Sequence, residues 1–181
     1  RGDELWQTSL RGNQAAELFL SSNGIYLASG SYTAHGKLRS FTQVFDKNGK
    51  QIGIFDETFR FADISDEGRI AMSTRNSVQL RQIGQPTSLF VWKTDSREEI
   101  VTGIRIVDSF IACSVEQVNV ENGIPTYNNP SLILLDGQAK LRSSKQLRGW
   151  SPKPATLSAE EQQITLTAAP RKTSIDINEL K

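Results

Sequence analysis

The residues that could carry catalysis are few and scattered. The chain contains one histidine, His35, and one cysteine, Cys113. A single residue of each type cannot build a standard zinc site, and any Ser-His-Asp arrangement would have to use His35 as its base. Neither a G-x-S-x-G motif nor a glycine-rich phosphate loop occurs. The sequence therefore predicts no catalytic residue, no metal ligand set and no cofactor.

Acidic residues recur where strands are expected to end. They are Asp63, Asp66, Glu67 and Asp108. A pair of carboxylates could act as the acid and the base of a glycosidase, so a carboxylate-dependent hydrolase remains an alternative function. The same positions also suit turns, because aspartate side chains accept hydrogen bonds from nearby backbone amides.

Aromatic and proline residues mark the candidate contact positions. The segment 119–130, NVENGIPTYNNP, is expected to be an exposed loop, with Tyr127 and Asn128 among polar neighbours. Tyrosine on a polar loop is a favoured contact residue, although a mobile insertion would look the same. Trp150 lies between glycine and proline and either anchors a partner or fills a gap between sheets, and Pro86 marks a similar loop. These residues form the predicted interaction surface.

Composition limits the class of protein. The 181 residues are 37% hydrophobic and carry a net charge of +1 without a basic block, so nucleic-acid binding is not indicated. No apolar run is long enough to span a membrane, and one cysteine excludes an internal disulfide. The first residue is not methionine, which favours an excised extracytoplasmic (periplasmic or extracellular) domain, with a cytoplasmic fragment as the alternative.

Strand and turn signals dominate the chain. Short β-branched and aromatic runs alternate with glycine-containing dipeptides that favour tight hairpins. The dipeptides are Asn23-Gly24, Asn48-Gly49, Glu67-Gly68, Asn122-Gly123 and Asp136-Gly137. The pattern predicts an all-β protein made of hairpins in series.

Two series of similar segments indicate an internal repeat. The first has anchors spaced by 44, 41 and 53 residues: Ser29, Ser73, Ser114 and Thr167. The second has anchors spaced by 47, 43 and 40 residues: Phe45, Trp92, Leu135 and Ile175. Both spacings fall near the length of a propeller blade. Small residues in the first series, such as Ala28 and Gly30, are expected to relieve crowding near the axis.

The repeat predicts about four units of four strands. The approximate units are 11–57, 58–101, 102–147 and 148–181, with 3–10 as an outer strand. In the second unit the third strand is expected at 89–96 and the outer strand at 97–102. The last unit lacks an outer strand, and the strand at 3–10 could complete it by closing a ring.

Several segments resemble β-propeller repeats. GIYLASGS is similar to the G-x-x-L-A-S-G-S element of WD40 repeats, and QVFDKNGK and FVWKTDSR resemble their V-W-D strand. The opening GDELW is similar to the G-x-x-x-W element of PQQ-type repeats. The chain departs from the pattern, because Val-Trp-Asp is never complete and Thr33 stands where WD40 repeats place an aspartate. The resemblance implies an architecture and no specific family.

The expected fold is thus an all-β, single-domain, propeller-like array of about four four-stranded blades, closed within the chain or part of a larger ring. The expected function is a non-catalytic protein–protein interaction module, a scaffold of a larger envelope or signalling assembly. The alternatives are a small-ligand sensor that uses the central channel and the hydrolase described above. The expected partners are proteins: the remainder of a longer chain, a second copy joined by strand exchange, or another polypeptide.

Overall fold

Four antiparallel sheets follow one another along the chain in the computed structural model. The structure describes six stretches: residues 6–12, 14–33, 40–56, 59–85, 87–160 and 162–180. Within them, each sheet is a meander whose consecutive strands are hydrogen-bonded neighbours, and we name the sheets blades 1 to 4 in chain order. The all-β prediction is confirmed.

Blade 1 follows the predicted order closely. Its strands are β1 (Gln14–Leu20), β2 (Tyr26–Tyr32), β3 (Ser40–Asp46) and β4 (Gln51–Phe55). The turns after β1 and β3 contain Gly24 and Gly49, whose φ angles of 71° and 78° are the left-handed values that glycine adopts without strain.

Blade 2 differs from the prediction in two strands. Its strands are β5 (Phe61–Ile64), β6 (Arg69–Ser73), β7 (Ser77–Gln82) and β8 (Phe90–Lys93). The predicted third strand at 89–96 is therefore the outer strand, and the predicted outer strand at 97–102 belongs to the next blade. The true third strand, SVQLRQ, has a polar sequence, but Val78 and Leu80 are buried and Arg81 stacks over the Phe55 ring at 4.5 Å.

Blade 3 has the longest strands. They are β9 (Glu99–Val107), β10 (Phe110–Glu121), β11 (Ile124–Leu135) and β12 (Leu141–Gln146). A short strand, β13 (Trp150–Ser151), also pairs with β11. The expectation of a loop at 119–130 is wrong, because both strands continue through this segment and only Asn122 and Gly123 form the turn.

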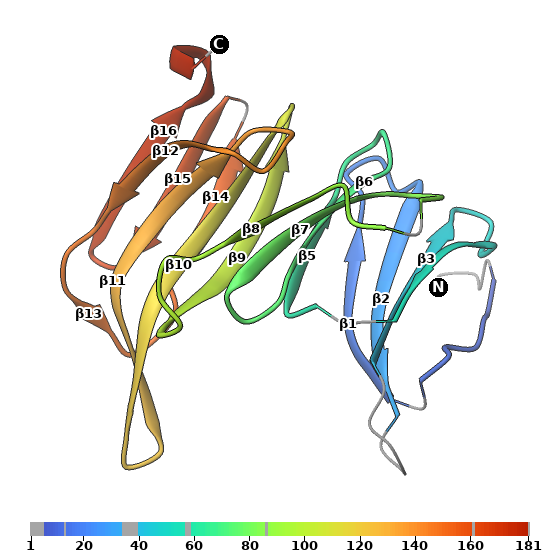
Figure 1. The fold of residues 1–181 in the computed structure, drawn as a ribbon, viewed down its shortest axis with the longest axis horizontal. Helices are drawn as coiled ribbons and strands as arrows, with labels where there is room; N and C mark the ends of the chain where they lie inside the picture. The colour runs from blue at the N-terminus through green and yellow to red at the C-terminus, as the bar shows by residue number, and fades with distance from the viewer. Residues whose placement is uncertain are drawn as a thin grey trace, which may run out of the picture.

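Blade 4 has three strands in the described residues. They are β14 (Thr156–Glu160), β15 (Gln163–Ala168) and β16 (Arg171–Asp176), followed by the 3₁₀ helix η1 (Ile177–Leu180). Residues 6–10, the described part of the expected outer strand 3–10, form no strand. Trp6 instead packs against Phe45 of blade 1, with ring centroids 6.0 Å apart. Blades 1 and 4 lie at opposite ends of an open arc (Figure 1).

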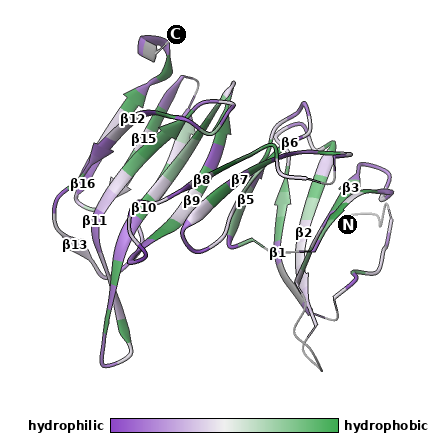
Figure 2. Cartoon of the chain, viewed as in Figure 1, coloured by the Kyte–Doolittle hydropathy of each residue, from purple (hydrophilic) through white to green (hydrophobic). Residues whose placement is uncertain are grey.

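The core consists of three clusters, one between each pair of successive blades. Ala28 and Val44 of blade 1 pack with Ile70 and Met72 of blade 2, and similar clusters join blades 2 and 3 and blades 3 and 4. Hydrophobic stretches accordingly follow the strands inside the arc (Figure 2). The anchors of the first repeat series, Ser29, Ser73, Ser114 and Thr167, all lie in second strands, β2, β6, β10 and β15. The spacing of the anchors in this series therefore gives the number of residues from one blade to the next.

Truncating a side chain between blades 3 and 4 tests this packing. Leu134 is fully buried in the cluster between these blades, so we expect Leu134→Ala to lower the free energy of unfolding by about 2–5 kcal/mol. Leu141 of β12 is 56% exposed, and Leu141→Ala should change it by less than about 0.5 kcal/mol. Urea denaturation measures the free energy of unfolding of both variants. A similar decrease in the two variants would contradict the assignment of Leu134 to the core.

Candidate functional site

The hairpin of β10 and β11 extends beyond the body of blade 3 (Figure 1). After a register shift between Val115 and Gln117, its strands pair regularly to the tip, where Val120 faces Pro125 and Glu121 faces Ile124. Val120 is 64% exposed and Ile124 is 65% exposed. Two large aliphatic side chains are thus presented to solvent on a regular, hydrogen-bonded element.

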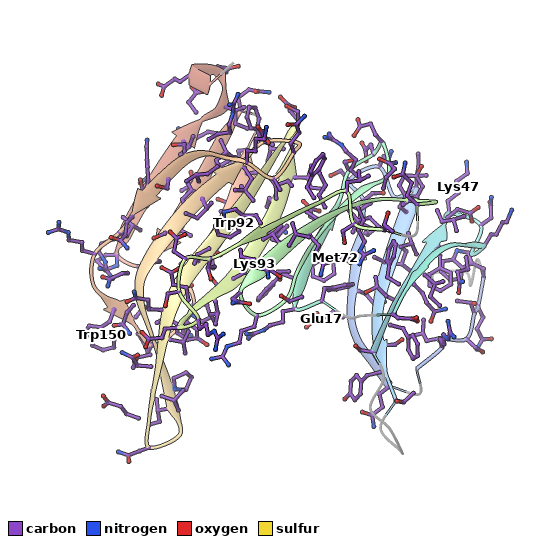
Figure 3. The ribbon with its side chains drawn as sticks, viewed as in Figure 1. Glu17, Lys47, Met72, Trp92, Lys93 and Trp150 are labelled. Atoms are coloured by element: carbon purple, nitrogen blue, oxygen red, sulfur yellow. The ribbon has the colours of Figure 1, made fainter. Side chains whose placement is uncertain are left out.

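Trp150 lies at the base of this hairpin. Strand β13 pairs Trp150 with Asn128 and Ser151 with Tyr127. The Arg171 guanidinium also donates a hydrogen bond of 3.1 Å to the Trp150 carbonyl. The tryptophan side chain itself is 63% exposed, at the outer border of the molecule (Figure 3). The alternative in which it fills a gap between blades is wrong.

The segment before Trp150 is held to β11 by backbone contacts. The Asn129 amide donates to the Gly149 carbonyl at 2.8 Å, and the Gly149 amide donates to Asn129 Oδ1 at 3.1 Å. Gly149 has a φ of 108°, a backbone conformation that residues with side chains rarely adopt. Glycine is therefore needed to bring Trp150 beside the hairpin.

Residues paired across antiparallel strands lie on one face of the sheet, and side chains alternate along each strand. Trp150, opposite Asn128, therefore shares a face with Thr126 and Ile124. Four residues of strand place Ile124 about 13 Å from Asn128. Val120, opposite Pro125, lies on the other face of the hairpin. We call the exposed apolar residues of this region, Val120 and Ile124 at the tip and Trp150 at the base, the hairpin surface.

The structure brings together three of the four predicted contact residues. Strand pairing makes neighbours of Tyr127, Asn128 and Trp150, although Trp150 is at least 22 positions away from the other two in the sequence. Pro86 lies outside the described residues. The exposed Val120 and Ile124 were not predicted, but Asn122-Gly123 flanked by alternating apolar residues is a hairpin signal that could have located them.

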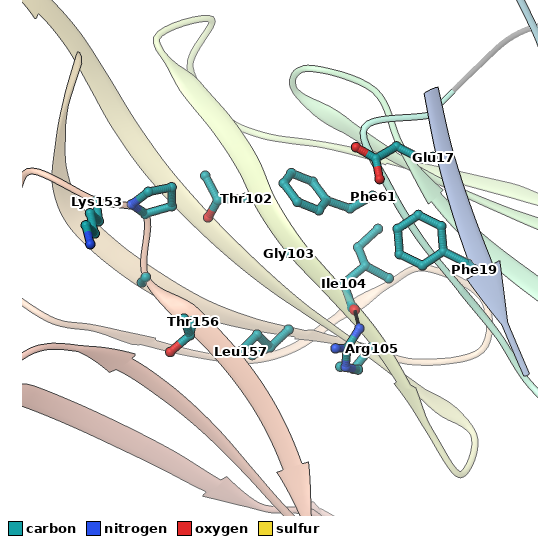
Figure 4. Close-up of a pocket in the computed structure, with 12 residues that line it drawn as sticks. Glu17, Phe19, Phe61, Thr102, Gly103, Ile104, Arg105, Lys153, Thr156 and Leu157 are labelled. Atoms are coloured by element: carbon teal, nitrogen blue, oxygen red, sulfur yellow. Dashed lines mark hydrogen bonds between the residues drawn. The ribbon is translucent and has the colours of Figure 1, made fainter. Parts of the chain in front are cut away.

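A second feature is a cavity of about 590 Å³ at the centre of the arc. All four innermost strands contribute to it, since its lining includes Phe19 of β1, Phe61 of β5, Ile104 of β9 and Leu157 of β14. Charged side chains, including Glu17 and Lys153, complete the lining (Figure 4). The small-ligand alternative of the sequence analysis would use this cavity.

A buried carboxylate supports one wall of this cavity. Glu116 is 1% exposed, and its Oε1 accepts hydrogen bonds from Thr102 Oγ1 at 2.7 Å and from the Ala155 amide at 2.9 Å. Its Oε2 is buried without a partner among the described residues. Burial raises the pKa of Glu116, and its two hydrogen bonds offset only part of this effect. Glu116 therefore joins blade 3 to the segment that leads into blade 4.

The carboxylates considered for hydrolysis have structural contacts. Asp63 accepts from the Ile64 amide at 3.0 Å and from the Ile106 amide at 2.8 Å, which links blade 2 to blade 3, and burial raises its pKa. Asp66 accepts from the Asn23 amide at 3.2 Å. Asp108 adopts a φ of 52° in the turn after β9. These are the contacts of turn and blade-joining residues.

Other chemistry has little support in the described stretches. Within them, no group of three or more histidine, cysteine, aspartate or glutamate side chains could hold a metal ion. Cys113 is fully buried, which raises the pKa of its thiol and disfavours the reactive thiolate. His35 lies outside the described residues. Helices long and hydrophobic enough to cross a bilayer are absent from this part of the chain.

Solved structures share this arrangement of sheets. BamB from Moraxella catarrhalis superposes with a TM-score of 0.56 at 10% identity, over 91% of this chain and 47% of that one. The fold is a β-propeller-like array of four blades. The β-propeller domain of Cps50 (Swd1) from Myceliophteria thermophila gives 0.56 at 14% identity, over 88% and 53%. The WD40 domain of Pan2 from Neurospora crassa gives 0.54 at 8% identity, over 92% and 63%.

The propeller assignment rests on structure alone. No protein-family model matches the sequence, and no curated protein does. The chain spans about half the length of these propellers, 47% of BamB and 53% of the Cps50 domain. The likeness to both WD40 and PQQ-type propellers agrees with the sequence resemblance, and it describes the fold and not the activity.

The buried carboxylate predicts an unusual dependence of stability on pH. Because the pKa of Glu116 is raised above its ordinary value of 4.5, the folded state binds more protons than the unfolded state above that pH. The contribution of Glu116 to stability is thus largest in acid and falls as the pH rises through its raised pKa. Glu116→Gln keeps an acceptor for Thr102 and Ala155 but carries no charge.

We therefore expect Glu116→Gln to raise the Tm at pH 8, by about 2–4 °C for each kcal/mol of charge burial removed, and to have a smaller effect at pH 4. Thermal melts from pH 4 to pH 8 measure this difference. Glu121→Gln at the exposed hairpin tip is the control and should leave the Tm unchanged. A Tm difference between Glu116→Gln and the wild type that does not vary with pH would contradict the prediction.

Proposed function

We propose that the chain is a non-catalytic protein-interaction module that binds a protein partner through the hairpin surface. The observation that carries the proposal is the exposure of Val120 and Ile124 at the tip of the projecting hairpin of blade 3 and of Trp150 at its base. Ile124 and Trp150 share one face of this element. Exposed apolar side chains on one face commonly mark a contact site, and tryptophan is enriched among residues that dominate binding energy.

The rigidity of this element favours tight binding. The hairpin is hydrogen-bonded along its length, and Trp150 is fixed through its backbone by Asn128, Asn129 and Arg171. A surface that is ordered before binding loses little conformational entropy when the complex forms. Asn119 and Thr126 surround the apolar tip with polar side chains, as at the rim of an interface.

A second copy of the chain is one partner that the fold could take. Strand β16 of blade 4 pairs only with β15 among the described strands, so its other edge can accept a strand. A strand-exchanged homodimer would complete blade 4. Light scattering over a range of concentrations would show a mass that doubles if this interaction forms.

The hairpin surface can be tested by affinity capture from the organism that encodes the protein. We compare the wild-type chain with Val120→Ser/Ile124→Ser, Trp150→Ala and the control Leu141→Ser, whose exposed leucine lies on β12. A genuine partner is captured by the wild type and the control and is lost with both hairpin variants.

The recovered partner is then purified and titrated directly. We expect Trp150→Ala and the double variant each to raise the Kd at least about tenfold, the size of effect that contact hot spots produce. Circular dichroism should show that all variants keep the fold, because the substituted side chains are exposed. Partner affinity that is the same for wild-type and hairpin variants would refute the proposed surface.

A further inference from the structure

The central cavity is chemically unlike the hairpin surface. It lies where the four innermost strands converge, and its volume of about 590 Å³ is within the range of small-molecule sites. Neither Val120 nor Trp150 contributes to it. Any ligand of this cavity would therefore bind independently of a partner on the hairpin.

The walls of the cavity are apolar and well supported. Phe19 and Phe61 form one side, and Leu157 lies on the other, with Ile104 of β9 between them (Figure 4). The Phe19 ring packs edge-on against buried Phe59, with centroids 5.2 Å apart. These walls can enclose an aliphatic or aromatic group without rearrangement.

The two ends of the cavity carry opposite charges. Glu17 lies beside the two phenylalanine rings, whereas Lys153 lies on the Leu157 side (Figure 4). Both side chains are exposed, and neither forms an ion pair with another described residue. Arg105 is differently placed, since its guanidinium donates to the Ile104 carbonyl at 3.0 Å and faces Asp63.

Two threonine hydroxyl groups also line the cavity, and both have hydrogen-bond partners. Thr102 Oγ1 contacts Ser114 Oγ at 2.9 Å and donates to Glu116 at 2.7 Å, and Thr156 Oγ1 donates to the Thr167 carbonyl at 3.5 Å. A ligand would therefore be recognised by its charges and its apolar body more than by hydrogen bonds to these hydroxyl groups. Besides the Arg105 guanidinium, which lies near Asp63, the charged groups of the lining are the Glu17 carboxylate and the Lys153 ammonium group.

We propose that the central cavity binds a small zwitterionic ligand with an apolar body, the chemistry of a hydrophobic dipeptide. The amino group of the ligand pairs with Glu17, its carboxylate pairs with Lys153, and its side chains contact Phe19, Phe61 and Leu157. Binding is reversible and involves no chemical step.

Calorimetric titration of the intact chain with L-leucyl-L-phenylalanine tests the proposal. We expect saturable binding with a Kd on the order of 0.1 mM, as ligand efficiencies allow for a molecule of this size. The N-acetylated and C-amidated forms of the same dipeptide lack one charge each, and each should bind about tenfold more weakly.

Matched variants assign each contact. Glu17→Gln should weaken binding of the free dipeptide about tenfold but leave the affinity for the N-acetylated form unchanged. Lys153→Gln should also weaken binding of the free dipeptide about tenfold but leave the affinity for the amidated form unchanged. Phe61→Ala should weaken the binding of every form of the dipeptide. Lys47→Gln, in an exposed turn of blade 1, is the charge control and should bind like the wild type.

Absence of saturable heat at millimolar dipeptide, or equal affinity for the free and capped forms, would overturn the proposal. Far-ultraviolet circular dichroism checks that each variant is folded, which is expected for Glu17 and Lys153 because both are exposed. The double hairpin variant Val120→Ser/Ile124→Ser should retain dipeptide binding. The result therefore distinguishes failure of the cavity from failure of the hairpin surface.

Discussion

Face-to-face packing of successive sheets is the interaction on which the structure depends. Each blade is a short meander that cannot enclose a core of its own, and the three apolar clusters all lie between two blades. Blade 2 shows the consequence most clearly. Ile70 and Met72 of β6 face blade 1, while Ala71 of the same strand faces blade 3, so both faces of this sheet are apolar.

This packing brings the innermost strands together and creates a need for polar contacts between them. Asp63 accepts the Ile106 amide across blades 2 and 3, and Glu116 accepts the Ala155 amide next to blade 4. Each carboxylate satisfies a backbone donor that would otherwise lack a partner, and each has its pKa raised by the burial that results. The central cavity is the space that remains between these strands, whereas the hairpin of β10 and β11 is free because it extends beyond the packed faces.

The outcome of the sequence predictions follows from the same geometry. The second strand of each blade is central in its sheet and therefore consists of small and apolar residues between clear turns. Because this pattern recurs, the series anchored on Ser29 located all four blades. The second series failed at Trp92, because the third strand of blade 2 has polar residues that are covered by neighbouring blades. Arg81 is buried against Phe55, a contact between residues 26 positions apart that no local pattern indicates.

By itself, the sequence determined the strand-and-turn character of the chain, the approximate length of a blade and the choice of Tyr127, Asn128 and Trp150 as residues of interest. These properties are local, because turn residues and alternating side chains act over a few positions. Tertiary structure decided that Trp150 lies beside the hairpin, that the arc remains open with Trp6 on blade 1, and that Glu17 and Lys153 border one cavity. Such arrangements depend on how whole sheets pack, since that packing brings together residues from distant parts of the chain.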